Sequence, residues 1–289
     1  MAMRTALSLV LACAGIPAVM SQSNIDPAHH EGDSDFIGTI DWRPGEAGAT
    51  INPYYCSGWL YGLNVGWIAM GTGEPLNKLH YSNLSATDFG VNVDASGALR
   101  GFAYGANIGW INFEAQGNPK VDWVSGKLTG KVYSANAGWI NLSDDSSDIR
   151  LSKVASSPDS DADGLPDAWE IAFAGNLGTL SGSNDSDGDG ISDLAEFIAG
   201  TSPLDASDFL AVGITVKPGQ GETIQWQSKP SVVYRVQERE AFDASSPWVD
   251  SALPSVIGTG DMLSVTLPVQ SEETHFFRVE AYPPLTAVN

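Results

Sequence analysis

The chain has 289 residues, enough for two or three small domains that each bury a core of their own. Its formal net charge is −21, which disfavours nucleic acids and anionic membranes as partners because both would repel it. Most of the excess negative charge lies in residues 144–208. Of the two cysteines, Cys13 would be removed with the signal segment described below, which leaves Cys56 without a partner in its own chain, so we expect no disulfide to stabilise the fold. We expect Cys56 to be a buried apolar residue; the alternative is an intermolecular bridge.

Residues 1–21 have the pattern of a secretory signal peptide. They begin with MAMR and continue with an apolar stretch that is interrupted by Gly15 and Pro17. A membrane anchor is the alternative, but the unbroken stretch is shorter than the roughly 20 apolar residues that a spanning helix needs. We therefore expect a secreted, extracellular protein with no transmembrane segment, which could also associate with a cell surface.

Residues 22–34 contain no periodic apolar pattern, which predicts a flexible leader. His29 and His30 lie within this leader. Adjacent histidines can bind a metal ion, but no carboxylate or cysteine ligand set stands at the right spacing around them. We therefore interpret both histidines as part of a solvated tail.

An internal repeat dominates the first predicted domain, residues 35–152. Its three copies are SGWLYGLNVGWIAM at 57–70, RGFAYGANIGWINF at 100–113 and TGKVYSANAGWINL at 129–142. In each copy, alternating residue types predict strands separated by a glycine-containing turn and an Asn-x-Gly turn. One copy cannot bury its aromatic face alone, so the copies must pack on one another. The sequence leaves two all-β arrangements open, a small meander sandwich or barrel and a short β-solenoid.

Aromatic residues recur at fixed positions of the repeat. They could form the core of the domain, or a surface on which sugar rings stack. Periodic aromatic residues in small β-repeats are mostly core residues, and we prefer that interpretation. A row of solvent-exposed rings would reverse the preference. The residues concerned are Tyr61, Trp67, Tyr104, Trp110, Tyr133 and Trp139.

Residues 153–207 contain two complete twelve-residue calcium loops, DSDADGLPDAWE at 159–170 and DSDGDGISDLAE at 185–196. Calcium takes about six to eight oxygen ligands, which alternate carboxylates supply as the loop wraps around the ion. Glycine at position 6 makes the bend, and a backbone carbonyl at position 7 and a bidentate glutamate at position 12 complete the site. The predicted ligands of the first ion are Asp159, Asp161, Asp163, Leu165, Asp167 and Glu170, and those of the second are Asp185, Asp187, Asp189, Ile191, Asp193 and Glu196.

Each loop leads into a predicted short helix, over residues 168–174 and 193–199, that ends at a glycine. Position 8, which is apolar in paired sensor EF-hands, is Pro166 in one loop and Ser192 in the other. The residues before each loop are also poor helix formers, so we expect a structural role for calcium. A disordered acidic linker is the alternative, but it would not need glycine and glutamate at the same positions of both loops.

Residues 208–283 show a second all-β pattern, in which five apolar segments are separated by Gly, Pro, Ser and Asp clusters. Short strands at this spacing predict an immunoglobulin-like or fibronectin-like β-sandwich. We expect residues 284–289 to form a tail. The two all-β regions, with short helices between them, predict a mostly β, multidomain fold class. The expected core residues of the sandwich are Trp226, Tyr234, Val236, Phe277 and Val279.

The calcium loops and the Gly-Thr-Ser-Pro ending at 200–203 resemble bacterial thrombospondin type 3-like repeats. Their usual form is an Asp/Gly calcium loop, a short helix and a Gly-Thr-x-Pro ending, with aspartate common where this chain has Ser202. The resemblance covers residues 155–208 and implies calcium-rigidified spacers between extracellular domains. The GANIGWINF units are similar to aromatic repeats of bacterial exported proteins, and residues 208–283 to β-sandwich modules that follow such calcium repeats. Neither similarity implies a reaction.

The position of both loops between two β regions favours a non-enzymatic extracellular protein. Two calcium ions would rigidify the joint between the β domains, in a protein that serves adhesion or extracellular binding. The first alternative is a carbohydrate-binding protein that uses the aromatic repeats, with a glycan or another cell-surface molecule as its partner. A dockerin-like partner module also has tandem calcium loops, but Pro166 and the Gly-Thr-x-Pro ending disfavour it.

An extracellular polysaccharide hydrolase is the remaining alternative, because two carboxylates suffice for that chemistry. No pair of acidic residues in the first domain lies in a motif that assigns an acid and a nucleophile. His80 and His275 stand alone, which disfavours a Ser-His-Asp site. The acidic residues considered are Asp41, Glu46, Asp88, Asp94, Glu114 and Asp122.

Overall fold

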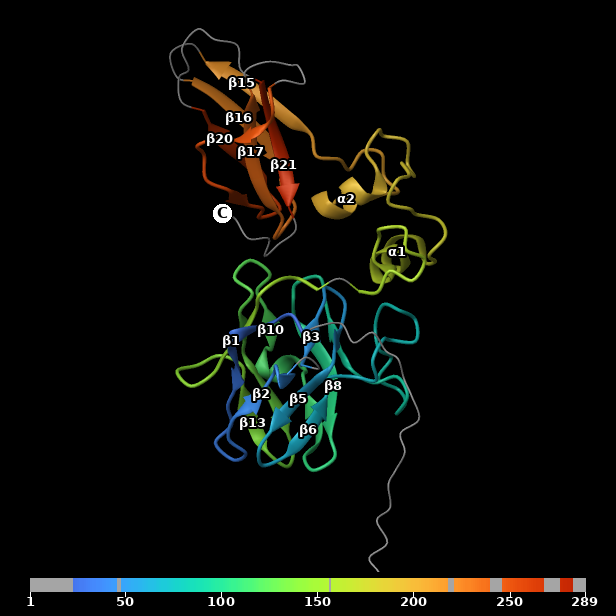
Figure 1. Ribbon diagram of the computed structural model, residues 1–289, viewed down its shortest axis with the longest axis vertical. Coiled ribbons are helices and arrows are strands. Elements are labelled where there is room, and N and C mark those ends of the chain that lie inside the picture. Colours follow the sequence, from blue (N-terminus) through green and yellow to red (C-terminus); the bar gives the residue numbers. More distant parts are fainter. Residues whose placement is uncertain are drawn as a thin grey trace, which may run out of the picture.

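The structure is a computed structural model of the chain, and it describes residues 23–45, 48–155, 157–217, 221–239, 246–267 and 276–282. Two short helices, α1 (Asp167–Ala174) and α2 (Asp193–Ala199), lie between an N-terminal and a C-terminal β region (Figure 1). The predicted mostly β, multidomain fold class is confirmed. The predicted signal peptide and C-terminal tail lie outside the described residues. Within the described part of the chain, no helix has the length and apolar character needed to span a membrane.

One large antiparallel sheet forms most of the N-terminal region, in the strand order β13-β12-β9-β8-β6-β5-β2-β1-β14, with β7 paired to β8. Its strands are β1 (Ile25–Gly32), β2 (Ile40–Asp41), β5 (Trp59–Gly62), β6 (Gly66–Ala69), β7 (Val91–Val93), β8 (Leu99–Gly105), β9 (Gly109–Asn112), β12 (Lys131–Ser134), β13 (Gly138–Asn141) and β14 (Asp148–Leu151). Beside it lie two short ribbons and a 3-10 helix: β3 (Thr50–Ile51) with β4 (Cys56–Ser57), β10 (Lys120–Val121) with β11 (Leu128–Thr129), and η2 (Ala115–Gly117).

Four hairpins make up the body of this sheet: β1–β2, β5–β6, β8–β9 and β12–β13. The last three are the three copies of the sequence repeat. The turn of every hairpin contains a glycine with φ between 68° and 75°, a conformation that L-residues with a Cβ rarely adopt. These glycines are Gly38, Gly66, Gly109 and Gly138. The first hairpin is therefore a fourth, divergent unit, with FIGTI at 36–40 where the others have Asn-x-Gly-Trp-Ile.

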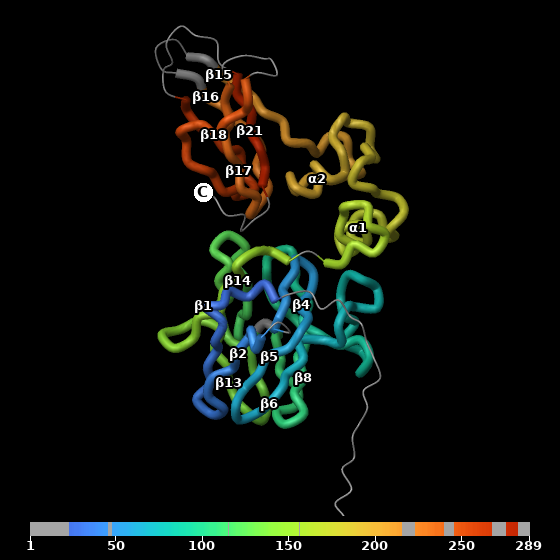
Figure 2. Tube along the Cα trace, viewed as in Figure 1, coloured from blue at the N-terminus to red at the C-terminus, as the bar shows by residue number. Residues whose placement is uncertain are grey.

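The flexible leader predicted for residues 22–34 is wrong, because β1 lies within it. β1 is paired on both edges, with β2 along one and β14 along the other. Figure 2 shows β1, in blue, beside β14, in green, although the two strands lie far apart in the sequence. His29 and His30 belong to this strand and not to a solvated tail: the His30 Nδ1 atom lies 2.7 Å from a carboxylate oxygen of Asp41. Pairing with distant strands orders a segment that has no apolar alternation of its own.

The sheet curls until β13, at one end of the strand order, meets the chain that follows β1. Asp33, directly after β1, exchanges two backbone hydrogen bonds with Asn141 at the end of β13. The turns are joined in the same circular order, because a side chain of each turn donates a hydrogen bond to a backbone carbonyl of the neighbouring turn. The donors and acceptors are Asn64 to Ile37, Asn107 to Val65, Asn136 to Ile108, and Ser34 to Ala137. Of the two open arrangements, the structure has the closed one, and residues 25–151 are called the hairpin barrel below.

Alternation along each hairpin sends one set of apolar side chains into the barrel. Trp42 and Phe113 lie at its centre, each 1% exposed, with ring centroids 6.5 Å apart. Cys56 is fully buried, which confirms the interpretation of this residue as an apolar core residue. The inward pairs of the three repeats are Leu60 and Ile68, Ala103 and Ile111, and Val132 and Ile140.

The C-terminal region consists of two small antiparallel sheets, called the C-terminal sheets below. The first contains β15 (Val212–Lys217), β16 (Gly221–Gln227) and β20 (Met262–Thr266), and the second contains β17 (Val233–Arg239), β18 (Val249–Asp250), β19 (Val256–Ile257) and β21 (Phe276–Tyr282). One apolar cluster joins the two sheets. It contains the five predicted core residues, of which Trp226, Tyr234 and Val236 are buried and Phe277 and Val279 partly buried.

Candidate metal centre

Each calcium loop gathers three aspartates into a cluster. One carboxylate oxygen from each aspartate lies within 4.8 Å of the other two. The residues occupy positions 1, 3 and 5 of their loop, so a tightly wound backbone turns alternate side chains toward one point. The two clusters are Asp159, Asp161 and Asp163 in the first loop and Asp185, Asp187 and Asp189 in the second.

Residues with positive φ angles allow both loops to turn tightly. Gly164 and Gly190, at position 6, have φ of 99° and 96°. Position 4 is also left-handed: Gly188 has φ of 80° in the second loop, but Ala162 has φ of 60° in the first. Glycine adopts this region without a steric penalty, whereas a residue with a Cβ pays about 1–2 kcal/mol. The first loop therefore contains local strain that the second avoids.

The aspartate at position 1 holds the bend from inside. Asp159 accepts hydrogen bonds from the backbone amides of Asp163 and Gly164, at 3.2 and 3.1 Å. In the second loop Asp185 accepts the amide of Gly190 at 2.9 Å. These bonds shape the loop with groups of its own, and the position-1 carboxylate still points toward the cluster.

The glutamate at position 12 gives the strongest indication of a bound ion. Glu170 is fully buried, and among the described residues neither of its carboxylate oxygens has a hydrogen-bond partner. Glu196 is also fully buried; one oxygen accepts a hydrogen bond from Thr201 at 3.3 Å, and the other has no partner within the described chain. Burial, followed by the charges of the neighbouring aspartates, raises the pKa of each glutamate to about 7. A divalent cation in each loop would compensate the charge of the glutamate of that loop.

The aspartate at position 9 of the first loop has its oxygens engaged by protein groups. Asp167 is fully buried and accepts the amide and the hydroxyl of Ser160, at 2.7 and 2.5 Å. Its Oδ2 atom also lies 2.5 Å from the ammonium of Lys78, a residue of the hairpin barrel. Burial disfavours its charge, but the hydrogen bonds from Lys78 and Ser160 outweigh burial and lower the pKa of this carboxyl.

The second loop repeats this arrangement with a different outside donor. Asp193 is fully buried and accepts the amide and the hydroxyl of Ser186, at 3.0 and 2.8 Å, and the backbone amide of Ser181 at 3.0 Å. Sequence analysis missed the serine at position 2, although its presence in both loops, as Asp-Ser-Asp, is a signal that could have revealed it. The structure does not bring the position-9 aspartates into the three-aspartate clusters, and their direct coordination of an ion stays a prediction.

Position 7 follows the glycine bend in both loops. The backbone amide of Leu165 donates to Asp163 at 2.9 Å, and that of Ile191 donates to Asp189 at 2.7 Å. These contacts fix the backbone beside the cluster. Ligation by the carbonyl groups of Leu165 and Ile191 stays a prediction.

The helix after each loop places the position-12 glutamate. α1 and α2 both start at position 9, so Glu170 and Glu196 lie in their first turns. The two helices predicted from the sequence are confirmed to within one residue. Gly175 and Gly200 end them in the left-handed conformation, with φ of 74° and 72°. Each helix therefore holds its glutamate against the loop that precedes it.

The donor set fits calcium. Each loop offers carboxylate oxygens from alternate positions and a buried glutamate, and neither loop contains a histidine or cysteine that would favour zinc. Magnesium is a weaker candidate because it gives up its waters reluctantly. Calcium bound there would link the bend of each loop to the helix that follows it.

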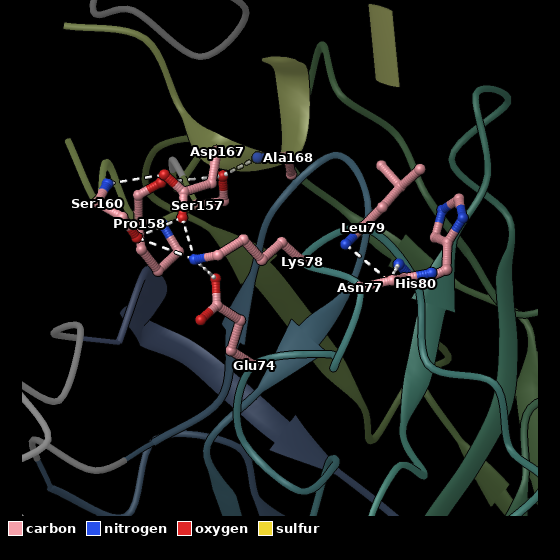
Figure 3. A network of polar contacts seen from close by, with 10 residues as sticks. All are labelled: Glu74, Asn77, Lys78, Leu79, His80, Ser157, Pro158, Ser160, Asp167 and Ala168. Carbon is pink, nitrogen blue, oxygen red and sulfur yellow. Dashed lines mark hydrogen bonds and ion pairs between the residues drawn. The ribbon is translucent and has the colours of Figure 1, made fainter. Parts of the chain in front are cut away.

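The first loop and α1 pack on the hairpin barrel. Ala168 lies in an apolar cluster with Tyr55 and Tyr81 of the barrel, and Trp169 lies in a second cluster with the barrel residue Tyr54. Figure 3 shows the polar contacts beside these clusters, where the side chain of Lys78 reaches from the barrel to the first loop.

The second loop continues the chain of contacts toward the C-terminal sheets. Phe197 of α2 packs edge-on against Trp169 of α1, with ring centroids 5.6 Å apart. After α2, Asp208 accepts the amide of Ser202 at 3.1 Å and lies 2.5 Å from the ammonium of Lys229, which lies in the connection between β16 and β17 of the C-terminal sheets. Gly200, at the end of α2, also approaches the C-terminal sheets, since a Cβ there would lie 3.3 Å from the side chain of Val232. Residues 157–208, called the calcium segment below, thus contact both β regions.

The repeated aromatic side chains lie on the outside of the barrel, so the predicted core location is wrong. Trp67, Trp110 and Trp139 are 51%, 48% and 38% exposed. The inward positions are filled by the aliphatic residues described above, which alternate with the rings. Each tryptophan packs against the tyrosine opposite it in its hairpin, with centroids 4.9 to 5.1 Å apart; these tyrosines are Tyr61, Tyr104 and Tyr133.

Comparison with known proteins agrees with the geometry of the second loop. Residues 185–206, which span this loop, α2 and the Gly-Thr-Ser-Pro ending, match the family model of the bacterial TSP3 repeat. No curated protein matches the chain, and no solved structure matches it. The family match and the two aspartate clusters together support calcium binding by this segment.

Proposed function

We propose that this chain is an extracellular, non-enzymatic protein in which two calcium ions stiffen the joint between the hairpin barrel and the C-terminal sheets. Its role would be adhesion or the binding of an extracellular ligand. The observation that carries the proposal is the pair of buried glutamates, Glu170 and Glu196, which have carboxylate oxygens with no partner among the described residues. Bacterial TSP3 repeats are typical of extracellular proteins, and this supports the location.

Calcium would act by reversing the electrostatics of each loop. Without an ion, clustered carboxylates repel one another and oppose the wound conformation. With an ion, the same carboxylates hold the loop closed. Because the segment contacts Lys78 at one end and Lys229 at the other, ordering the loops also strengthens the contacts with both β regions. Calcium affinity on the order of 10⁻⁴–10⁻³ M is typical of extracellular modules.

Limited proteolysis of the full chain tests this function. Calcium is expected to slow cleavage within residues 157–205 relative to the same protein in EGTA. A double variant, Glu170→Gln with Glu196→Gln, serves as the matched control and should be cleaved at the same rate in both conditions. Equal cleavage of the unmodified protein with calcium and with EGTA would reject the proposed stiffening of the joint.

We propose neutral carbohydrate as a second candidate ligand, bound by the outer aromatic face of the hairpin barrel. The half-exposed tryptophans favour it, because exposed rings can stack on sugar rings. Trp110 has the richest surroundings, with ring centroids of Phe89, Phe102 and Tyr104 at 5.0, 6.0 and 4.9 Å. These neighbours hold the indole in place and lower the conformational entropy lost on binding. The net charge of −21 disfavours acidic glycans.

Binding of the protein to insoluble cellulose and chitin tests the carbohydrate candidate. Trp110→Ala is expected to lower retention on a polysaccharide that the unmodified chain binds. Phe36→Ala is the control, because Phe36 is 81% exposed but lies at a hairpin turn, outside the Tyr–Trp pairs. Lack of retention on every neutral polysaccharide tested, or equal loss in both variants, would count against this candidate.

Acidic residues of the hairpin barrel hold turns, which supports a binding role over hydrolysis. Asp88 accepts the backbone amides of Ser82 and Leu76, at 2.9 and 3.3 Å, and these bonds lower the pKa of its carboxyl. Asp94 accepts the amides of Ser96 and Ala98, at 2.8 and 3.1 Å. A general acid in a glycosidase needs a raised pKa, and the environment of Asp88 has the opposite effect.

A further inference from the structure

The two calcium loops differ in the donor that reaches the position-9 aspartate from outside the loop. In both, the buried position-9 aspartate accepts the amide and the hydroxyl of the serine at position 2. Each also accepts a third donor from outside the loop: the ammonium of Lys78 for Asp167, and the backbone amide of Ser181 for Asp193. The serine bonds are intrinsic to the loop, whereas the third donor comes from the part of the chain packed before it.

In each loop the third donor comes from the part of the chain that precedes the loop and packs against it. Ser181 belongs to a segment that lies against the first loop, since a Cβ on the next residue, Gly182, would stand 2.7 Å from the carbonyl oxygen of Asp163. For the first loop, the preceding module is the hairpin barrel, and no backbone amide of the described residues takes the place that Ser181 has in the second loop. Lys78 supplies the donor there, from the segment between β6 and β7.

Lys78 is suited to this position because its ammonium donates hydrogen bonds to two acceptors of the first loop and forms an ion pair with a third group, Glu74. The Nζ atom lies 2.5 Å from Asp167 Oδ2, 2.9 Å from Ser160 Oγ and 3.6 Å from Glu74 Oε1 (Figure 3). Its side chain is 31% exposed, while the partner carboxylate of Asp167 is fully buried. A buried carboxylate that loses its cationic partner is costly, so the contact and the wound loop stabilise each other.

We infer that Lys78 is a positioning residue that couples calcium occupancy of the first loop to the docking of that loop on the hairpin barrel. The inference rests on the proposed function, because calcium must first order the loop. By linkage, an ion that stabilises the wound loop also stabilises the Lys78–Asp167 contact, and the contact in turn strengthens binding of the ion. The effect of calcium thereby reaches barrel residues that hold no ligand of their own.

Hydrogen exchange of the full chain in calcium and in EGTA tests the coupling. The readout is the barrel segment 76–81, where the amides of Leu79 and His80 donate to Asn77 at 2.9 Å. In the unmodified protein, calcium is expected to slow exchange in this segment by about fivefold or more, the lower end of common coupling between sites. It should also slow exchange within 159–170.

Lys78→Met is expected to keep calcium protection within 159–170 and to lose it at 76–81. Lys78→Arg should restore part of the protection, because it keeps the charge. Lys120→Met is the matched control: Lys120 is an exposed lysine of β10, and its removal should leave both segments as in the unmodified protein.

The outcomes separate the two proposals. Equal calcium protection at 76–81 in the unmodified protein and in Lys78→Met would overturn the role of Lys78 and leave the proposed function standing. Absence of calcium protection within 159–170 in the unmodified protein would overturn the proposed function, and the coupling with it. Loss at 76–81 in both Lys78→Met and Lys120→Met would show a general charge effect and would also overturn the role of Lys78.

Discussion

Lowering the pH from 8 to 6 is expected to weaken calcium binding at each loop about tenfold. The pKa of Glu170 and that of Glu196 are raised to about 7 in the calcium-free protein, mainly by burial. At pH 8 both carboxyls are largely ionised and can bind the ion directly. At pH 6 they are largely protonated, and calcium must displace a proton. One pH unit below a pKa corresponds to a factor of about ten, or about 1.4 kcal/mol.

Protonation of the same glutamates weakens calcium binding but stabilises the calcium-free folded protein. A glutamate that moves from a pKa of 4.5 to about 7 on folding disfavours the folded state when ionised. The contribution of these carboxyls to calcium-free stability is therefore present below pH 4.5 and is lost as the pH rises through 7. Calcium restores it, so the increase in Tm on adding calcium should be larger at pH 8 than at pH 6.

Isothermal titration calorimetry at pH 6, 7 and 8, in two buffers of different ionisation enthalpy, measures both affinity and proton release. About one proton per site should be released at pH 6 and few at pH 8. Glu170→Gln isolates the second loop and Glu196→Gln isolates the first, so each site can be followed alone. Equal affinity at pH 6 and pH 8 without proton release would refute the reasoning, because it would show that these glutamates do not face the ion.

Two further predictions concern the stability of the calcium-free protein. Ala162→Gly should stabilise it by up to about 1 kcal/mol in urea denaturation, because Ala162 has positive φ. Gly188→Ala, at the same position of the second loop, should destabilise it, and a shift of the same sign for both variants would contradict the proposed strain. Asn107→Ala should lower the free energy of unfolding by about 1 kcal/mol, since it removes the hydrogen bond to the carbonyl of Val65. Leu63→Ala is its control, because Leu63 is a turn residue that is 88% exposed. An equal loss of unfolding free energy in both variants would contradict a stabilising role of the hydrogen bond between turns.

The calcium loops could be predicted because their ligand residues are neighbours in the chain. Spacing alone placed the aspartates that the structure gathers within 4.8 Å, and glycines marked the ends of α1 and α2. The three repeats likewise gave their strands and turns. The fourth hairpin escaped detection because Phe36 and Thr39 replace the asparagine and tryptophan of the repeat, and only the glycine and the neighbouring aliphatic residues remain.

The sequence by itself determined the local structures of this protein: the loops, the helices, the repeated hairpins and the mostly β class. Tertiary structure alone decided which face of a hairpin is buried. Alternation separates Leu60 and Ile68 from Tyr61 and Trp67, but both sets are apolar, so only closure of the barrel shows that the aliphatic set lies inside. It also decided the contact between Lys78 and Asp167, because a partner 89 residues away is set by packing, and no local pattern encodes it.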